Sequence, residues 1–199
     1  KSKIAFVGDS HTLALLDAEE IFTNLGFQII HFSHAGCPFP IPPYGIYPHE
    51  CEQFLNNAEM KIFQNLNFGD SIVIHNYHLR YFGGKNLQDT RDYFYDRNGK
   101  LVSDPSTKID LYMNGLKKLA NKAFSKSITI YLIGSPYRNP NLSFRKEWFR
   151  LSNPAMETLI EEANNAKKMN QILSKKIKDN SMTNVIFIDP LAILNKSCG

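Results

Sequence analysis

A serine stands where the first apolar segment of the chain gives way to a helical pattern. Ser10 follows Gly8 and Asp9, which come directly after the apolar run from Ile4 to Val7. If that run is a strand, the Ser10 hydroxyl lies at the carboxyl edge of a sheet, near N–H groups at the start of a helix. Such groups favour the negative charge that develops when a serine attacks a carbonyl carbon. Ser10 is therefore the candidate nucleophile; the alternative is that Ser10 or Asp9 only caps the helix.

Motifs for several rival chemistries are absent from the sequence. The chain has no G-x-S-x-G elbow, no G-x-G-x-x-G dinucleotide fingerprint and no phosphate loop ending in G-K-S or G-K-T. These absences disfavour an ordinary α/β-hydrolase, a dinucleotide enzyme and a P-loop NTPase.

Apolar runs and helical patterns alternate along the chain. We predict strands at residues 4–7, 27–32, 71–75, 128–133 and 185–188, and helices at 12–25, 51–66, 106–124 and 154–179. The runs are rich in Ile, Val and Phe without clean alternation, which is typical of strands buried on both faces. The expected fold is a three-layer α/β sandwich with a parallel five-stranded sheet and right-handed crossovers.

Three long connections follow the predicted strand ends, where parallel sheets carry their active sites. They are residues 33–50, 76–105 and 134–153. The second contains many aromatic side chains, which either pack the loop onto the sheet or form a wall for a sugar ring: Tyr77, Tyr81, Phe82, Tyr93, Phe94 and Tyr95. We favour packing for most of them. In the predicted helix 12–25, the apolar residues Leu13, Leu16, Ile21 and Leu25 lie near one face, and Gly26 is a candidate C-cap.

Length and composition indicate one globular domain over residues 1–199. Apolar residues make up 43% and charged residues 21% of the chain, which disfavours disorder. The net charge of +4 is scattered, without the clustered basic face that a nucleic-acid site needs. There is no apolar run of membrane-spanning length and no signal-peptide pattern. The chain begins without Met, so we expect it to be a piece of a longer or processed protein.

The three cysteines leave two interpretations open. Cys37 and Cys51 bracket a proline-rich loop that a disulfide would close in an oxidising compartment, and Cys198 would then pair beyond this sequence. The alternative is three free thiols. The same region also offers His31, His34, Cys37, His49 and Cys51 as possible zinc ligands. That set matches no standard spacing, and a disulfide explains Cys37 and Cys51 more simply, so we expect no metal and no cofactor.

The segment Phe6 to His11, reading F-V-G-D-S-H, resembles the first block of the SGNH hydrolase superfamily. The resemblance implies Ser10 as nucleophile. It also implies that the backbone N–H of Gly36, in H-A-G-C-P, and the side-chain amide of Asn76, in I-H-N-Y, complete the oxyanion hole. The usual G-x-N-D form around the Asn is absent.

One branch of the superfamily is a closer match, on the strength of G-D-S-H, the Gly36-Cys37-Pro38 segment, Cys51 and the late Ile188-Asp189-Pro190 segment. These features resemble the periplasmic SGNH domain fused behind an acyltransferase-3 membrane domain. The resemblance implies a serine-dependent O-acyltransferase that acts on a cell-surface glycan or lipopolysaccharide, with acetyl as the expected acyl group. Its partners would be an acyl donor, a glycan acceptor and the fused membrane domain, and the full-length protein would be extracytoplasmic and membrane-tethered. A carbohydrate O-acyl esterase and a non-catalytic glycan-binding or docking module are the alternatives.

The family carries its catalytic base on a late Asp-x-x-His segment, and no such segment occurs in these residues. We expect it to lie beyond Gly199. A general base must come within about 3 Å of the serine hydroxyl, directly or through one water. His11, His75 and His78 are the other histidines that the sequence brings toward this edge, and each also has an ordinary structural explanation.

Overall fold

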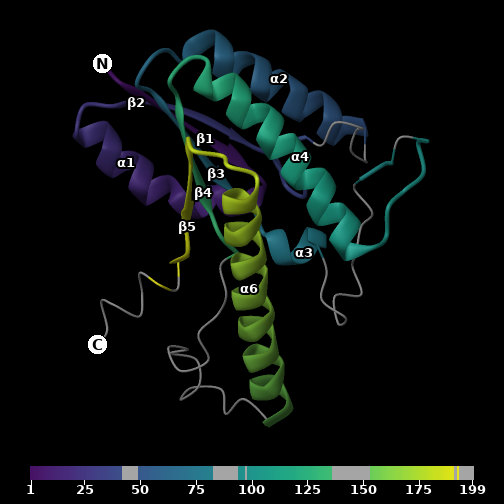
Figure 1. Ribbon diagram of the computed structural model, residues 1–199. Helices are drawn as coiled ribbons and strands as arrows, with labels where there is room; N and C mark the ends of the chain where they lie inside the picture. Colours follow the sequence, from purple (N-terminus) through teal and green to yellow (C-terminus); the bar gives the residue numbers. More distant parts are fainter. Residues whose placement is uncertain (42–48, 83–93, 97, 136–152, 191, 193–199) are drawn as a thin grey trace.

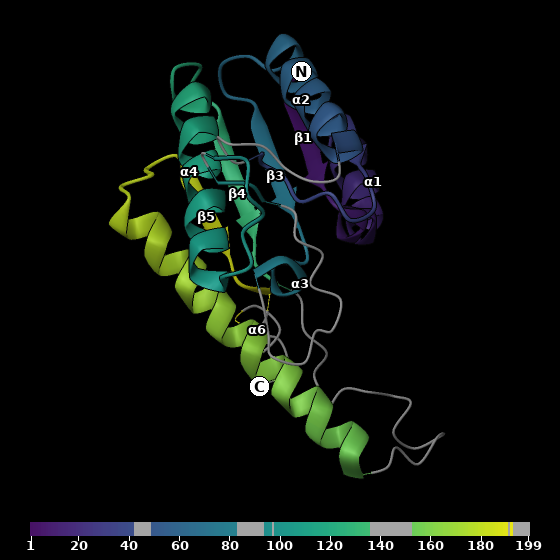
Figure 2. The ribbon, with the colours of Figure 1, turned by 90° about the vertical axis from the view of Figure 1, so that its right-hand side faces the viewer.

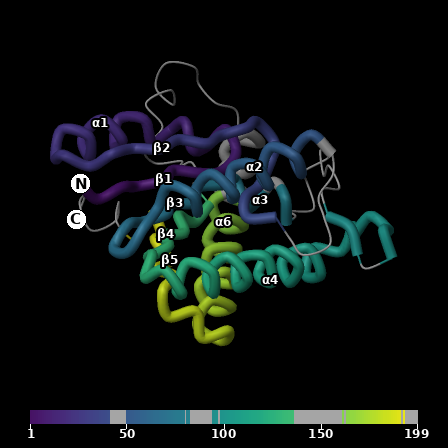
Figure 3. Tube along the Cα trace, turned by 90° about the horizontal axis from the view of Figure 1, so that it is seen from above, coloured from purple at the N-terminus to yellow at the C-terminus, as the bar shows by residue number. Residues whose placement is uncertain are grey.

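The computed structural model describes residues 1–41, 49–82, 94–96, 98–135, 153–190 and 192, without the side chains of 49, 80, 153–160 and 162. Its centre is an all-parallel five-stranded sheet in the order β2-β1-β3-β4-β5. Figure 3 shows this order from above. The strands are β1 (Lys3–Gly8), β2 (Gln28–Ser33), β3 (Ser71–His75), β4 (Thr129–Ile133) and β5 (Val185–Ile188). The expected α/β fold with a parallel five-stranded sheet is confirmed.

Helices fill the intervals between the strands (Figure 1). The chain forms the 3-10 helix η1 (Ser10–Leu15) and the helices α1 (Leu16–Asn24), α2 (His49–Asn65), α3 (His78–Phe82), α4 (Pro105–Phe124) and α6 (Asn153–Asp179). Helices α2, α4 and α6 each begin and end within two residues of the predicted bounds. The short helix α3 lies inside the segment 76–105 that the sequence pattern assigned to a connection.

The main hydrophobic core lies on one face of the sheet. Ile72 and Ile130 of neighbouring strands are fully buried in the same cluster as Leu55 of α2, Leu116 of α4 and Leu173 of α6. Right-handed crossovers place these three helices together, because each connects a strand to the next strand in the same direction across the sheet. The β1–β2 crossover runs the opposite way, so α1 covers the other face (Figure 2).

The first helix differs from the sequence prediction. Four apolar side chains that were expected on one face of a helix over 12–25 are each about half exposed or more: Leu13 49%, Leu16 50%, Ile21 60% and Leu25 68%. Residues 10–15 form a 3-10 helix, which has three residues per turn, so the 3.6-residue periodicity assumed from residue 12 does not hold. Helix α1 instead contacts the sheet through Phe22, whose ring lies 6.3 Å from that of Phe6. Gly26 follows the helix with a φ of +92°, as a C-cap glycine does.

Among the described residues, none of the helices combines the length and the apolar character needed to cross a membrane.

Candidate active site

Three segments leave the sheet at the same level. Gly8, the last residue of β1, pairs with Ser33 of β2 on one side and with His75 of β3 on the other. The residues that follow are Asp9, the His34 loop and Asn76, so the three sequence blocks begin side by side at the carboxyl edge. A hydrogen bond from the His34 N–H to the Gly8 carbonyl (3.3 Å) continues this alignment past the strand ends.

Gly8 permits a close approach between β1 and β3 at this edge. A Cβ atom at this position would lie 2.0 Å from the carbonyl oxygen of His75 and 2.5 Å from Thr12 Oγ1. The same His75 carbonyl accepts a 2.9 Å hydrogen bond from the Thr12 hydroxyl. The segment that carries Ser10 is therefore held against the end of β3 by contacts on both sides of the nucleophile.

Ser10 itself is exposed at the start of η1. The residue that caps this helix is Asp9, whose carboxylate accepts the His11 backbone N–H at 2.8 Å. Capping is thus assigned to Asp9, and in the described parts of the chain the Ser10 hydroxyl has no hydrogen bond. An exposed hydroxyl without a structural role fits a nucleophile better than a cap.

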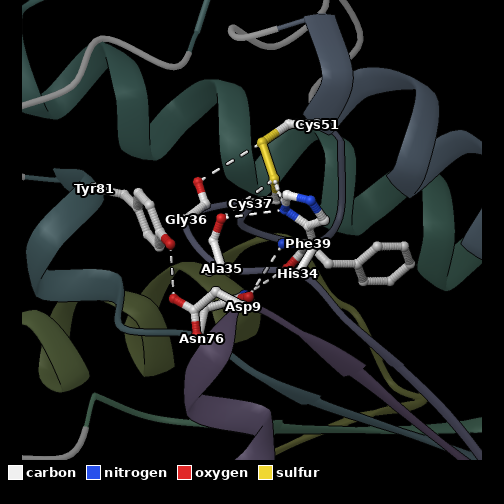
Figure 4. The surroundings of a disulfide bond; sticks show 9 residues. All are labelled: Asp9, His34, Ala35, Gly36, Cys37, Phe39, Cys51, Asn76 and Tyr81. Atoms are coloured by element: carbon white, nitrogen blue, oxygen red, sulfur yellow. Dashed lines mark hydrogen bonds between the residues drawn. A yellow bond between two sulfur atoms is a disulfide. The ribbon is translucent and has the colours of Figure 1, made fainter.

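Asp9 is a buried carboxylate, 1% exposed, that joins the segment after β1 to the segment after β3. Its Oδ1 accepts the N–H of His11, and its Oδ2 accepts the N–H of Tyr77 (2.9 Å) and the hydroxyl of Tyr81 (2.7 Å). Figure 4 shows the bond from Tyr81. Burial alone would raise the pKa of Asp9, but the side chain of His11 and these hydrogen bonds together outweigh burial and lower the pKa below its usual value. Asp9 stays ionised and fixes the position of the chain directly after Asn76.

Gly36 lies directly before the loop that a disulfide closes. Cys37 and Cys51 are joined, so the predicted disulfide is confirmed and the free-thiol alternative fails for these two residues. Gly36 has a φ of +77°, in the left-handed region that favours glycine. Figure 4 shows that the disulfide lies directly beside this glycine. The bond ties the Gly36 loop to the first turn of α2.

Asn76 is fully buried and bridges two segments. Its Oδ1 accepts the N–H of Phe39 (3.1 Å), and its Nδ2 donates to the carbonyl of Phe39 (2.6 Å) and to the hydroxyl of Tyr112 (3.3 Å). Tyr112, on α4, also donates to the Phe39 carbonyl (3.1 Å). In this arrangement the amide of Asn76 holds the loop that contains Gly36. Sequence reasoning did not find Tyr112, because its helical spacing is that of a core residue.

At the same edge of the sheet, polar residues after β4 and β5 form hydrogen bonds with α6. Asn170 of α6 accepts the N–H of Ser135 at 2.7 Å and donates to Asp189 Oδ1 at 3.2 Å. A Cβ on Gly134 would lie 2.7 Å from the Asn170 side chain, so the helix approaches the strand end closely here. Only Asp189 was noted from sequence; Asn170 carries no local signal, since its role depends on how α6 crosses the sheet.

Two of the three histidines near the site are buried and neutral. Burial lowers the pKa of His75 to about 4 and that of His78 to about 3, against the opposing effect of the Asp9 carboxylate. His78 Nε2 lies 3.1 Å from the Tyr112 hydroxyl. His11 is partly exposed, with Nδ1 3.2 Å from Asp9 Oδ1 and its ring 4.6 Å from that of Tyr77. In the described residues, no hydrogen bond joins any of these rings to Ser10.

The buried His75 predicts a pH dependence of stability. Its folded-state pKa of about 4 lies below the ordinary value of 6.5, so between these pH values the unfolded chain binds a proton that the folded chain does not. The free energy of unfolding should therefore fall with falling pH, by about 1.4 kcal/mol per pH unit for this group. In His75→Leu this contribution should disappear. Urea unfolding from pH 7.5 down to pH 4.5 measures it, and an unchanged slope would contradict the assignment. The difference at pH 7.5, where the ring is neutral in both states, reports packing alone.

The five possible zinc ligands named from the sequence do not form one cluster in the described residues. The ring of His31 pairs with Glu19 and with the Ser33 hydroxyl on the α1 face of the sheet. The side chain of His49 lies outside the described residues. The ligand atoms of His34, Cys37 and Cys51 do lie within 4.8 Å of one another.

The aromatic residues of the segment 76–105 are mainly packing residues, as favoured from the sequence. Tyr81, Phe82 and Phe94 are each 2% exposed or less. The rings of Phe82 and Phe94 stack at 5.9 Å. Tyr77 and Tyr95 are half-buried, and Tyr93 lies outside the described residues.

A family model described as "SGNH domain (fused to AT3 domains)" matches residues 1–198. No curated protein matches the chain.

Proposed function

Because the chain belongs to the family of SGNH domains that are fused to AT3 domains, we propose that Ser10 is the nucleophile of an O-acyltransferase. Family membership supports a hydrolase or acyltransferase type of activity. The observation that carries the proposal for Ser10 is the convergence, at one sheet edge, of an exposed hydroxyl with the Gly36 loop and the Asn76 segment.

The proposed reaction has two steps. Ser10 Oγ attacks the carbonyl carbon of an acyl donor, its proton passes to a general base, and the protonated leaving group departs from an acyl-enzyme. A glycan hydroxyl then attacks the acyl carbon, gives its proton to the base, and Ser10 Oγ leaves and regains a proton. An acetyl group is the acyl group that we expect, and a cell-surface glycan or lipopolysaccharide is the proposed acceptor.

The oxyanion of each step needs donors that are already in place. We assign this role to the backbone N–H groups of Ser10 and Gly36 and to the Asn76 amide. Asn76 Nδ2 donates one N–H to the Tyr112 hydroxyl at 3.3 Å, and this is the N–H that we propose the oxyanion shares, which leaves the amide plane in place. The other N–H of the same amide donates to the Phe39 carbonyl, with Nδ2 2.6 Å from that oxygen, and keeps the Gly36 loop in position.

The proposed setting follows from the fused domain. An AT3 domain on the same polypeptide would tether this domain at an extracytoplasmic membrane surface and pass it the acyl group. The Cys37–Cys51 disulfide supports an oxidising compartment.

An esterase is the second candidate, because Ser10 is exposed and water can reach an acyl group on it. Transfer and hydrolysis differ in acceptor binding and in the exclusion of water. A docking module is the third candidate; its support is the absence of an Asp-x-x-His segment from these residues.

The test is a partition experiment. The longest natural form of the polypeptide and residues 1–199 are each given a radiolabelled acetyl ester together with increasing concentrations of glycan. As the glycan concentration rises, a transferase should release less labelled acetate and form more labelled glycan, while the rate of donor consumption stays constant. Ser10→Ala should neither release labelled acetate nor label the glycan. Release of acetate alone at every acceptor concentration would indicate the esterase, and consumption that is equal in Ser10→Ala would exclude the serine mechanism.

A further inference from the structure

A pocket lies between helix α6 and β5, the last strand of the sheet, which run side by side (Figures 1 and 2). Its volume is about 350 Å³, and small-molecule sites have volumes of about 300 to 1,000 Å³. Phe187 and Asp189 form one wall. The other wall is one face of α6, whose lining residues recur at alternating intervals of one and three: Asn170, Gln171, Ser174, Lys175, Lys178 and Asp179.

One end of the pocket lies at the same sheet edge as Ser10. Asn170 bonds to Ser135 after β4 and to Asp189 after β5, and both of those residues follow strand ends. Three strand intervals separate β1 from β5, which is about 14 Å. A ligand that lies in the pocket and also presents a group to Ser10 must therefore be a chain of several units.

The α6 wall carries polar groups that bind nothing else in the described ranges. There the side chains of Gln171, Ser174 and Lys175 form no hydrogen bond and no ion pair. The neighbouring Lys176 differs, because it does not line the pocket and its ammonium pairs with Asp110 of α4 at 2.5 Å. An amide and a hydroxyl each donate and accept hydrogen bonds, as a sugar hydroxyl does. The wall thus offers both kinds of partner that a polyhydroxylated ligand needs.

The charges of the pocket favour an uncharged ligand. Lys175 and Lys178 are balanced by Asp179 and Asp189, so the lining has no net charge. A phosphate or an acidic sugar in this volume would lie close to a carboxylate, whereas a neutral hydroxyl donates to carboxylates and accepts from ammonium groups. The half-buried Phe187 adds apolar surface, which suits the C–H groups of a sugar ring.

We propose that this pocket binds a neutral hexose unit of the acceptor glycan, several units away from the hydroxyl that receives the acyl group. The role in transfer rests on the function proposed for Ser10, but the binding itself does not require the serine. A unit held here gives a long acceptor binding energy that a single sugar lacks. The enzyme should therefore use glycan chains in preference to single sugars.

The first experiment measures binding of the longest natural form of the polypeptide to immobilised dextran, mannan and galactan by biolayer interferometry. Polygalacturonate is the acidic comparison. At least one neutral polymer should bind, with an affinity that does not change as the salt concentration is raised, because no ion pair with the ligand is screened. Binding to none of the neutral polymers, or to polygalacturonate alone, would overturn the proposal.

The second experiment places the binding in the pocket. Gln171→Ala combined with Lys175→Ala should weaken binding of the neutral polymer by roughly tenfold, as the loss of two ordinary hydrogen bonds does. Lys176→Ala is the matched control, because Lys176 is the next lysine along α6 and pairs with Asp110 instead. Its affinity should equal that of the parent. A double variant that binds as tightly as the parent, or an equal loss in Lys176→Ala, would overturn the proposal.

Transfer assays separate this inference from the proposed function. The double variant should raise the KM for the polymer by about the same factor as it weakens binding, and the KM for the single sugar much less. An equal rise for both acceptors would overturn the remote position of the pocket. Ser10→Ala should still bind the polymer but transfer no acyl group. Transfer by Ser10→Ala would contradict the proposed function alone, since the binding results do not depend on it.

Discussion

Replacing Ser10 by alanine is expected to lower the rate of ester turnover by at least about a thousandfold, because loss of a serine nucleophile leaves only the contribution of binding and oxyanion stabilisation. The melting temperature should stay unchanged. Ser10 is exposed, and in the described parts of the chain its hydroxyl makes no hydrogen bond that the substitution could remove. Stopped-flow or steady-state hydrolysis of an activated acetyl ester, together with thermal unfolding, measures both quantities.

Ser125→Ala is the matched control for Ser10→Ala. Ser125 is also exposed, but it follows the end of α4 at the opposite edge of the sheet. Its turnover should equal that of the parent. Comparable loss in both variants would show that turnover does not depend on the Ser10 edge, and retention of turnover in Ser10→Ala would exclude Ser10 as nucleophile.

Asp9→Asn is expected to lower the free energy of unfolding by about 3 kcal/mol at pH 7, through lost charge-assisted hydrogen bonds and one buried donor left unpartnered. The two oxygens of Asp9 accept the backbone N–H groups of His11 and Tyr77. An amide has only one oxygen, so whichever way it turns, its NH₂ group faces one of these N–H groups. Asp9 also anchors the chain directly after Asn76, so the rate of ester turnover should fall in this variant as well. Urea unfolding of both proteins tests the stability effect.

Asp104→Asn is the control that separates the effect of burying a carboxylate, as at Asp9, from the effect of losing its charge. Asp104 caps α4 by accepting the Thr107 N–H, but it is exposed, and asparagine is an equally good N-cap. The free energy of unfolding should barely change in this variant. Equal destabilisation by both substitutions would contradict the account of Asp9 as a buried junction.

The strands were predictable because they are short apolar runs bounded by turn residues, and each lies within a residue of its predicted bounds. Their parallel direction followed from alternation with helices, whereas their order in the sheet, β2-β1-β3-β4-β5, is known only from the structure. The face of α1 was not predictable in this way. A pattern read at 3.6 residues per turn cannot anticipate that residues 10–15 form a 3-10 helix, which changes the direction in which Leu13 and Leu16 point.

The candidate site was predictable where its residues follow strand ends. Ser10, Gly36 and Asn76 each come within three residues of such an end, so their gathering at one edge is a consequence of register. The supporting contacts come from helices far away in sequence. Tyr112 of α4 and Asn170 of α6 lie at core-facing positions, and only the crossing of those helices over the sheet shows that their polar atoms meet Asn76 and Asp189.

Active-site labelling tests the central claim about Ser10 most directly. The longest natural form of the polypeptide is treated with a fluorophosphonate, which reacts with activated serines, and the modified residue is located by peptide mass spectrometry. The account predicts one adduct, on the peptide that contains Gly8-Asp9-Ser10-His11, protected by an acyl ester and absent from Ser10→Ala. An adduct on another residue would contradict this account. So would a protein that turns over the ester but whose Ser10 does not react with the fluorophosphonate.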